Sequence, residues 1–267
     1  MLIGSYFKNI KPKFKNHYFS GLSFDSRKCK KNNIFFAVKG NAINGNQFIK
    51  DAIKNGARTI ISNGKFQGLK GKVLFLKKKN IRKTLSELVH KLYKKKPKNL
   101  IAVTGTNGKS SIADFYLQIF SLNKKKAASI GTLGIKTFAK NVEVTNTTLD
   151  PIKLGYFLKK LKEQNIDNII LEASSHGLAQ NRIDGINFKT GIFTNLSHDH
   201  LDYHKNFKNY LNAKLYLFKK ILKKYSNVIT DDSISQYNKI EKISKKRGLF
   251  LKTIGSKRSN LSLIDHK

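Results

Sequence analysis

The chain has 267 residues, enough for one large domain or two ordinary ones, each with its own hydrophobic core. Its 53 Lys and Arg against 16 Asp and Glu give a formal charge of +37, and its one cysteine, Cys29, excludes a disulfide framework and a cysteine-based metal site. No segment approaches the ~18–20 apolar residues of a membrane span, and the N-terminus lacks a signal-peptide core. A cytoplasmic protein is expected.

The charge pattern favours compositional drift over nucleic-acid binding. The basic residues are nearly all lysines, spread along the whole chain beside abundant Asn and Ile, as in an AT-rich coding sequence. Arg clusters with interleaved aromatics, which read bases and backbones, are lacking. We therefore expect no specific nucleic-acid partner, although a basic nucleic-acid-binding protein remains the alternative. The positive electrostatic field of so basic a chain would attract polyanions such as ATP or a nucleotide sugar.

Short apolar runs alternate with segments of helical spacing along the chain. This alternation predicts an α/β fold with a mostly parallel sheet. A helix is expected at 80–94, and the charged, proline-bearing KKKPKN (94–99) marks the boundary between a small α/β domain at 1–95 and a second at 96–267. The apolar runs that predict strands are 34–38, 58–62, 72–76, 100–104 and 168–173.

The segment IAVTGTNGKSS (101–111) predicts a phosphate-binding loop of unusual form. The common pattern G-x-x-x-x-G-K-[ST] requires a glycine at position 103, where this chain has Val103. A buried strand nevertheless leads into the loop and a plausible helix (111–120) follows it, so backbone N–H groups would face an anion. Lys109 would reach the outer phosphates and the Ser110 hydroxyl would bind Mg²⁺.

Polar residues cluster after the strand in NIILEASSHGLAQNR (168–182). Glu172 ends a buried strand, where a charge is costly unless it is paired. A Mg²⁺ ion between Ser110 and Glu172 would be one partner, and a lysine salt bridge is the commonplace alternative. The polar residues just beyond lie where α/β sheets bind ligands, and they are Ser174, Ser175, His176, Gln180 and Arg182.

A histidine-rich segment, SHDHLDYHKNFKNY (197–210), has metal-ligand chemistry without a decisive spacing. Alternating histidines on one face of a strand would suit zinc, and ordinary hydrogen-bonding histidines are equally compatible. The residues alone leave the metal open.

Lys214 is the most informative single residue. If 206–222 is a helix, Lys214 lies within an apolar stripe. The ordinary outcome is that its ammonium reaches water along the surface. The alternative is burial, which lowers the pKa of the amine, so that CO₂ would carbamylate it and create an oxygen ligand. The stripe comprises Phe207, Tyr210, Leu211, Phe218, Ile221 and Leu222.

Together these motifs resemble the Mur ligase family, and within it the UDP-N-acetylmuramyl-tripeptide synthetases (the MurE type). That family's ATP loop also lacks the first glycine of the common pattern. The resemblance runs from about residue 20 to 235, with the motifs in the family's order. They are FDSR (24–27), IFFAVKGNAINGNQFI (34–49), TGTNGKSS (104–111), NTTLDP (146–151), LEASSHGLAQNR (171–182), FTNLSHDHLDYH (193–204) and NAK (212–214).

The resemblance implies an ATP- and Mg²⁺-dependent ligase of peptidoglycan precursor synthesis, and thus of cell-wall biogenesis, cell shape and division. ATP would phosphorylate the D-Glu carboxylate of UDP-N-acetylmuramoyl-L-alanyl-D-glutamate, and a third amino acid, diaminopimelate or lysine, would attack the acyl phosphate. Catalysis would involve Lys109, Glu172, His200 and carbamylated Lys214, and the metal ligands would be Ser110, Glu172, His200 and Lys214. The implied ATP-binding residues are Gly105, Thr106, Asn107, Gly108, Lys109, Ser110 and Ser111. The implied substrate contacts are Ser26, Asn41, Ala42, Ile43, Asn146, Thr147, Thr148, Ser174, Gln180 and Arg182.

The resemblance also carries a departure. The first domain would bind the UDP-sugar and the second would be a P-loop-type ATP-binding domain, expected to be incomplete at its C-terminal end. The family's third domain, which selects the amino acid, is expected to be absent from these residues, with a separately encoded domain as a candidate partner. The alternatives are a non-catalytic remnant that only binds ATP or UDP-sugar, and another Mur or folylpolyglutamate-type ligase.

Overall fold

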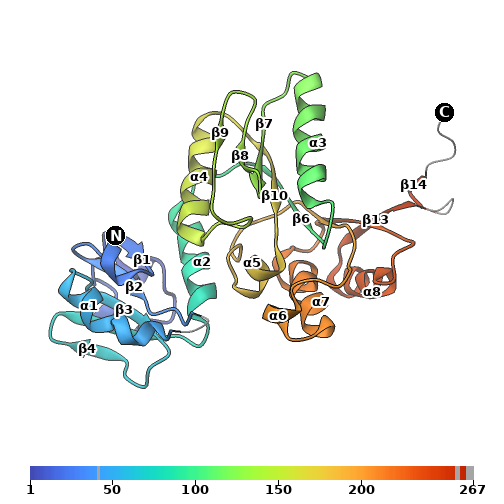
Figure 1. Cartoon of the computed structure of the whole chain (residues 1–267). Helices are drawn as coiled ribbons and strands as arrows, with labels where there is room; N and C mark the ends of the chain where they lie inside the picture. The colour runs from blue at the N-terminus through green and yellow to red at the C-terminus, as the bar shows by residue number, and fades with distance from the viewer. Residues whose placement is uncertain (41–42, 256–258, 263–267) are drawn as a thin grey trace. The chain divides into compact units, whose positions relative to one another are not determined.

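The computed structural model describes residues 1–40, 43–255 and 259–262. The chain divides into two compact units, Met1–Leu92 and Tyr93–Lys267, a few residues before the boundary that the sequence predicts. Each unit is an α/β structure built on a largely parallel sheet, which confirms the predicted fold class (Figure 1). Among the described residues, no helix combines the length and the apolar character that crossing a bilayer demands.

The first unit is built on a five-stranded sheet of order β1-β2-β3-β5-β4, in which only the edge pair β4–β5 is antiparallel. Its middle strands are fully buried, as expected of a parallel sheet covered on both faces. The strands are β1 (Gly21–Ser23), β2 (Asn33–Phe36), β3 (Thr59–Ser62), β4 (Gly68–Lys70) and β5 (Val73–Lys77). The helices are α1 (Ile49–Lys54) and α2 (Ile81–Leu92), with 3₁₀ turns η1 (Ile3–Ser5), η2 (Pro12–Phe14), η3 (Ser26–Lys28) and η4 (Gly45–Phe48).

The second unit contains a nine-stranded sheet of order β14-β13-β12-β11-β6-β10-β7-β8-β9. It is parallel from β14 to β7, and β8 and β9 add an antiparallel hairpin at one edge. The strands are β6 (Asn99–Thr104), β7 (Ala127–Gly131), β8 (Gly134–Lys136), β9 (Asn141–Val142), β10 (Asn168–Glu172), β11 (Thr190–Phe193), β12 (Asn227–Asp231), β13 (Phe250–Gly255) and β14 (Leu261–Ser262).

Helices cover the second sheet unequally. On one face, α3 packs against β6, β7 and β10; on the other, α4, α7 and α8 enclose the large apolar core. Figure 1 shows α3 and α4 on opposite sides of these strands. The helices are α3 (Lys109–Leu122), α4 (Pro151–Glu163), α5 (Ser175–Ala179), α6 (Leu201–His204), α7 (Phe207–Tyr216) and α8 (Tyr237–Arg247), and α7 continues into a π-helical turn, η5 (Leu217–Ile221).

The strands that hold the candidate site are the middle ones. Because β6, β10, β7 and β11 are parallel neighbours, their carboxyl ends meet at one edge of the sheet. The phosphate loop follows β6, and Glu172 is the last residue of β10. The topology therefore brings together motifs that lie far apart in sequence.

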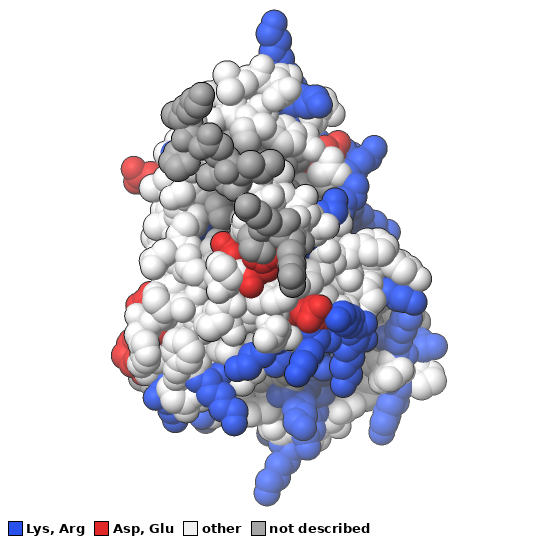
Figure 2. Space-filling view, turned by 90° about the vertical axis from the view of Figure 1, so that its right-hand side faces the viewer, with Lys and Arg blue, Asp and Glu red and all other residues white. Residues whose placement is uncertain are grey.

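The charge is a property of the surface. Figure 2 shows Lys and Arg side chains gathered towards the lower and right-hand edges of the face in view, with few acidic side chains among them. The lysines of the run 124–126 are all exposed, as expected of a solvated connection.

Candidate active site

The phosphate loop joins β6 to α3 in a conformation that needs its glycines. Gly108 has φ +82° and precedes the first residue of α3, Lys109. A Cβ on Gly105 would overlap the Thr194 hydroxyl oxygen, so the backbone approaches its neighbour more closely than any side chain allows. The strand–loop–helix arrangement that the sequence predicts is confirmed, and α3 begins two residues earlier than expected.

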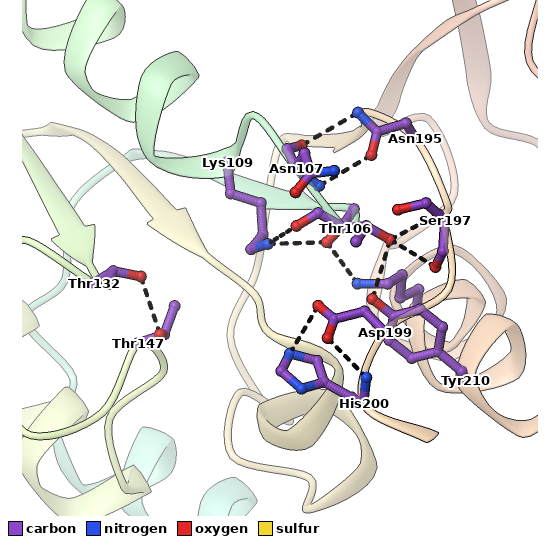
Figure 3. Close-up of polar contacts among 12 residues, drawn as sticks. Thr106, Asn107, Lys109, Thr132, Thr147, Asn195, Ser197, Asp199, His200 and Tyr210 are labelled. Atoms are coloured by element: carbon purple, nitrogen blue, oxygen red, sulfur yellow. Dashed lines mark hydrogen bonds and ion pairs between the residues drawn. The ribbon is translucent and has the colours of Figure 1, made fainter. Parts of the chain in front are cut away.

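Residues after β11 hold this loop in place. The Thr106 N–H donates to the Asn195 carbonyl at 3.0 Å, and the Asn107 N–H donates to the Asn195 side-chain oxygen at 3.0 Å. The Thr194 hydroxyl donates to the Asn107 carbonyl at 2.7 Å. Figure 3 shows Asn195 beside Asn107, with Ser197 and Tyr210 on the far side of Thr106. The loop is therefore fixed from outside before any ligand binds.

Lys109 folds back onto its own loop. Its Nζ donates to the carbonyls of Gly105 at 3.0 Å and Thr106 at 2.7 Å (Figure 3). Burial lowers the pKa of this ammonium, and the carboxylates of Glu172 and Asp199 oppose that shift. The carbonyls hold the cation at the mouth of the loop, where a bound phosphate would compete for it.

Glu172 is buried, with 2% of its surface exposed, and its carboxylate is fully engaged by neutral donors. The Ser110 hydroxyl donates to Oε2 at 2.9 Å, the Thr132 N–H to Oε1 at 3.0 Å and the Thr132 hydroxyl to Oε2 at 3.2 Å. Among the described residues, the carboxylate forms no ion pair, so the commonplace lysine bridge is not what stabilises it.

The position of Glu172 depends on Gly131, the last residue of β7. A Cβ on Gly131 would overlap the Glu172 carboxylate. The bare backbone of β7 thus forms a socket into which the acid from β10 fits, with the Ser110 hydroxyl on its other side. A cavity of about 10 Å³, roughly the room one water needs, adjoins Ser110, Gly131 and Glu172.

These residues fit the first Mg²⁺ ion that the family resemblance implies. The Ser110 hydroxyl oxygen and Glu172 Oε2 lie 2.9 Å apart beside the small cavity. Both are oxygen ligands, which Mg²⁺ prefers. The second implied pair, His200 and Lys214, fits only in part, because an unmodified lysine amine is not a magnesium ligand.

Lys214 is buried, with 1% of its surface exposed, so its ammonium does not reach solvent. The Nζ donates to the Gly105 carbonyl at 2.5 Å and lies 4.5 Å from the centre of the Tyr210 ring. Burial, with the nearby positive charge of Lys109, lowers the pKa of the amine from 10.5 to about 7, against an opposing effect of Asp199. A large fraction is therefore neutral near pH 7, the form that reacts with CO₂.

The helix around Lys214 is close to the one expected. The predicted helix 206–222 is α7 followed by the π-helical turn η5. Tyr210, at the centre of the apolar stripe, is fully buried, and its hydroxyl lies 3.1 Å from the Thr106 hydroxyl. Tyr210 therefore connects the lysine helix to the phosphate loop.

The histidine segment forms no strand, so the face-sharing geometry expected for zinc is wrong. Residues 197–200 are irregular, and α6 follows. His198 stacks on Phe207 away from the others, and across the described part of the chain no group of three or more His, Cys, Asp or Glu is arranged to hold a metal. His200, half-exposed and with φ +51°, is held by Asp199, whose carboxylate lies 3.3 Å from its Nε2.

His176 lies between two other histidines, His200 and His204. The ring of His176 lies 4.9 Å from that of His200 and 5.4 Å from that of His204. His204 is buried, and burial with the positive charge around it lowers its pKa to about 4. Burial also lowers the pKa of His176. His204 is therefore neutral at physiological pH.

The predicted sugar-peptide contacts in the second unit do lie close together. Arg182 donates to the Gln180 side-chain oxygen at 3.1 and 2.8 Å and to the Thr148 carbonyl at 2.5 Å. Thr148, buried, donates to the Glu172 carbonyl at 2.8 Å and lies 3.0 Å from the Ser174 hydroxyl. Thr148 thus braces the site from within.

The remaining contacts are more open or lie in the first unit. The Thr147 hydroxyl lies 3.0 Å from that of Thr132 (Figure 3), and Asn146 is exposed. Ser26 opens η3 and is buried, whereas Ile43 is 52% exposed. Asn41 and Ala42 lie outside the described residues.

The motifs predict no role in the site for three residues that the structure places there. Thr132 donates twice to Glu172, Asn195 braces the phosphate loop, and Tyr210 supports Lys214. Thr132 and Asn195 share one available signal, because Thr132 directly follows β7 and Asn195 lies two residues after the end of β11. The same argument that singled out the residues beyond Glu172 would have found them.

The glycine loop, the buried acid and the buried lysine on a parallel sheet define an α/β fold of the Mur ligase type. The model for the Mur ligase middle domain matches residues 103–265, and the model for the Mur ligase family, catalytic domain, matches residues 18–93. The chain belongs to the Mur ligase family.

Its relatives are named for one reaction. It is similar to the UDP-N-acetylmuramoyl-L-alanyl-D-glutamate--2,6-diaminopimelate ligase of Rickettsia prowazekii (strain Madrid E), with 40% identity over 93% of this chain and 52% of the relative. The ligase of the same name from Wigglesworthia glossinidia brevipalpis is 41% identical over 84% of this chain and 47% of the relative. The chain spans about half the length of the curated relatives it matches.

Solved structures agree with this assignment. A UDP-N-acetylmuramoyl-L-alanyl-D-glutamate--2,6-diaminopimelate ligase superposes with a TM-score of 0.86 and 27% identity, over 99% of this chain and 55% of that one. The MurF ligase from Thermotoga maritima in complex with ADP gives a TM-score of 0.56 at 17% identity over 91% of this chain and 52% of that one, a likeness of fold alone.

Proposed function

We propose that this chain carries the ATP and UDP-sugar sites of a ligase that adds the third amino acid to UDP-N-acetylmuramoyl-L-alanyl-D-glutamate. The observation that supports it best is the grouping at one sheet edge of the phosphate loop, Glu172 with its Ser110 and Thr132 donors, and the buried amine of Lys214. The names of the relatives favour diaminopimelate as the incoming amino acid, with lysine as the alternative to test.

Each part of the site would perform one task. The loop from Gly105 to Ser111 would bind the ATP phosphates through its N–H groups and the start of α3. Lys109, released from its own carbonyls, would neutralise the outer phosphates. The site would hold the D-Glu carboxylate in line with the γ-phosphate. Phosphoryl transfer between the two bound substrates would then avoid the entropy cost of bringing them together from solution.

Residues of this chain would also hold the metal. Ser110 and Glu172 would bind one Mg²⁺ ion, and His200 with carbamylated Lys214 a second, supplying charge neutralisation to the phosphate oxygens. Asp199 fixes His200 by contacts at both its backbone N–H and its ring. Ser174, Gln180 and Arg182 would hold the sugar peptide, together with Thr147 from the segment before α4.

The test separates phosphoryl transfer from ligation. With ATP labelled by ¹⁸O in the β–γ bridge, the dipeptide substrate should promote positional isotope exchange in the absence of any amino acid. Exchange that requires both UDP-N-acetylmuramoyl-L-alanyl-D-glutamate and Mg²⁺ is the expected result. If neither ATP nor the UDP-sugar dipeptide binds the purified chain in calorimetry, the proposal is wrong.

A further inference from the structure

A cavity of about 890 Å³ opens on the second unit, at the other end of β7 from the phosphate site. It lies between the β8–β9 hairpin and the second half of α4, which are neighbours in Figure 1. Ala127, at the start of β7, lines it, whereas Gly131, at the end of the same strand, holds Glu172. Strand β7 therefore borders both sites, but no residue with a role in the proposed ligase reaction lines the cavity.

The walls of the cavity are apolar and aromatic. Phe138 is 53% exposed and Tyr156 is 43% exposed, and Phe157 packs against the main core behind them. Ile135, Leu161 and Ile166 form its floor. A volume of this size, lined mainly by apolar groups, is typical of sites for small organic molecules, and exposed aromatic walls of this kind favour a ligand with a flat or aliphatic body.

The rim of the cavity is positive. Lys126, Lys140 and Lys160 line it, and no acidic side chain does so among the described residues. None of the three lysines forms an ion pair within the described part of the chain. Lys160 is exposed, and its ammonium lies 5.2 Å from the centre of the Tyr156 ring, so the charge stands beside the aromatic wall.

From this arrangement we propose that the cavity is a binding site for a small amphipathic anion, with an apolar body against Tyr156 and Phe157 and an acidic group at the lysine rim. The cavity differs from the nucleotide site in its chemistry, because among the described residues no glycine loop and no helix N-terminus lines it. The acidic group would meet the Lys160 ammonium beside the Tyr156 ring. An uncharged molecule of the same shape would lose this interaction.

Fluorescent probes test the proposal on the intact chain. Anilinonaphthalene sulfonate, an anion, should bind saturably at one site and more tightly than uncharged N-phenylnaphthylamine. Lys160→Glu should weaken binding of the anion at least about fivefold, or ~1 kcal/mol, and leave the uncharged probe unchanged. An excess of ATP should not displace either probe.

Lys159 supplies the matched control. It neighbours Lys160 on α4 but does not line the cavity, and it pairs with Glu163 at 3.5 Å. Lys159→Glu makes the same change in net charge, so it should leave the affinity for the anion within about twofold, or ~0.4 kcal/mol. Ala139→Trp, at an exposed lining position, should block both probes without lowering the melting temperature.

Three outcomes would overturn the proposal. Equal weakening by the two lysine variants would reduce the effect to general charge attraction. Displacement of the anion by ATP would place the probe in the phosphate loop. Unchanged binding of both probes to Ala139→Trp would put them somewhere else on the surface. None of these results would contradict nucleotide binding at the loop, so the proposed ligase function stands or falls separately.

Discussion

Lys109 and Lys214 donate to the same oxygen, the carbonyl of Gly105, at 3.0 and 2.5 Å. One lysine comes from the phosphate loop and the other from a helix that begins about a hundred residues later in the chain. Two ammonium groups on one neutral acceptor repel each other, which is part of the reason that the pKa of Lys214 is low. A polyphosphate bound at the loop would draw Lys109 away and leave the carbonyl to Lys214.

The low pKa of Lys214 predicts a dependence of stability on pH. Between about pH 7 and 10.5 the unfolded chain binds a proton at this amine that the folded chain does not, so the free energy of unfolding rises with pH over that range. The expected rise is at most ~1.4 kcal/mol per pH unit. Lys214→Met should abolish it. Urea unfolding at several pH values in CO₂-free buffer measures it.

The control for this experiment is Lys220→Met, an exposed lysine in the same helical segment. It should follow the parent chain at every pH. If Lys214→Met also follows the parent chain, the amine keeps its proton in the fold, and its carbamylation becomes implausible on chemical grounds.

Glu172→Gln should separate metal binding from folding. Glutamine keeps the shape in the Gly131 socket but loses the negative charge, so affinity for a non-hydrolysable ATP analogue should fall about tenfold or more when Mg²⁺ is present, or ~1.4 kcal/mol. In EDTA the two proteins should bind the analogue equally. Calorimetry with and without Mg²⁺ gives both numbers, and an unchanged response to Mg²⁺ would remove Glu172 from the metal site.

Two glycines of the phosphate loop should respond differently to alanine. At Gly105 the new methyl group overlaps the Thr194 hydroxyl, and relieving that overlap should cost ~1–3 kcal/mol and most of the nucleotide affinity. At Gly108 nothing lies within 4 Å, so alanine meets only the strain of φ +82°, ~1–2 kcal/mol. Unfolding and ATP titrations of the two variants would contradict this if Gly108→Ala lost more nucleotide affinity than Gly105→Ala.

Tyr210→Phe should loosen the phosphate loop without disturbing Lys214. It removes the hydroxyl that lies 3.1 Å from Thr106, a loss of about 1 kcal/mol, and keeps the ring beneath the amine. Tyr210→Leu removes both, so only this variant should also change the pH dependence described for Lys214. Identical pH profiles for the leucine and phenylalanine variants would show that the ring has no influence on the amine.

Much of the fold could be predicted because its strands are short apolar runs. β2, β3, β5, β6 and β10 all lie within one or two residues of the runs at 34–38, 58–62, 72–76, 100–104 and 168–173. Most of the strands that were not predicted are half-exposed or very short. The exception is β7, which is fully buried but has the sequence AASIG, with a single large apolar residue. β13 alternates exposed and half-buried residues, and β9 has only two residues, so neither carries the continuous apolar signal of a buried parallel strand.

The site was predictable as a set of residues but not as a set of contacts. Lys214 stood out because a charge occupied an apolar stripe, and it is buried. That it would share the Gly105 carbonyl with Lys109 depends on strand order, which periodicity does not encode. The partners of Glu172 were unpredictable for the same reason, because Thr132 reaches it only through the pairing of β7 with β10.

The residues tolerated at positions 131 and 172 depend on each other. While Glu172 occupies the socket, any side chain at 131 collides with it, so a change at 131 becomes tolerable only after the acid has been replaced by something smaller. The order of such events is therefore one-way. An alanine or larger residue at 131 therefore marks a chain in which the acid at 172 has already been lost.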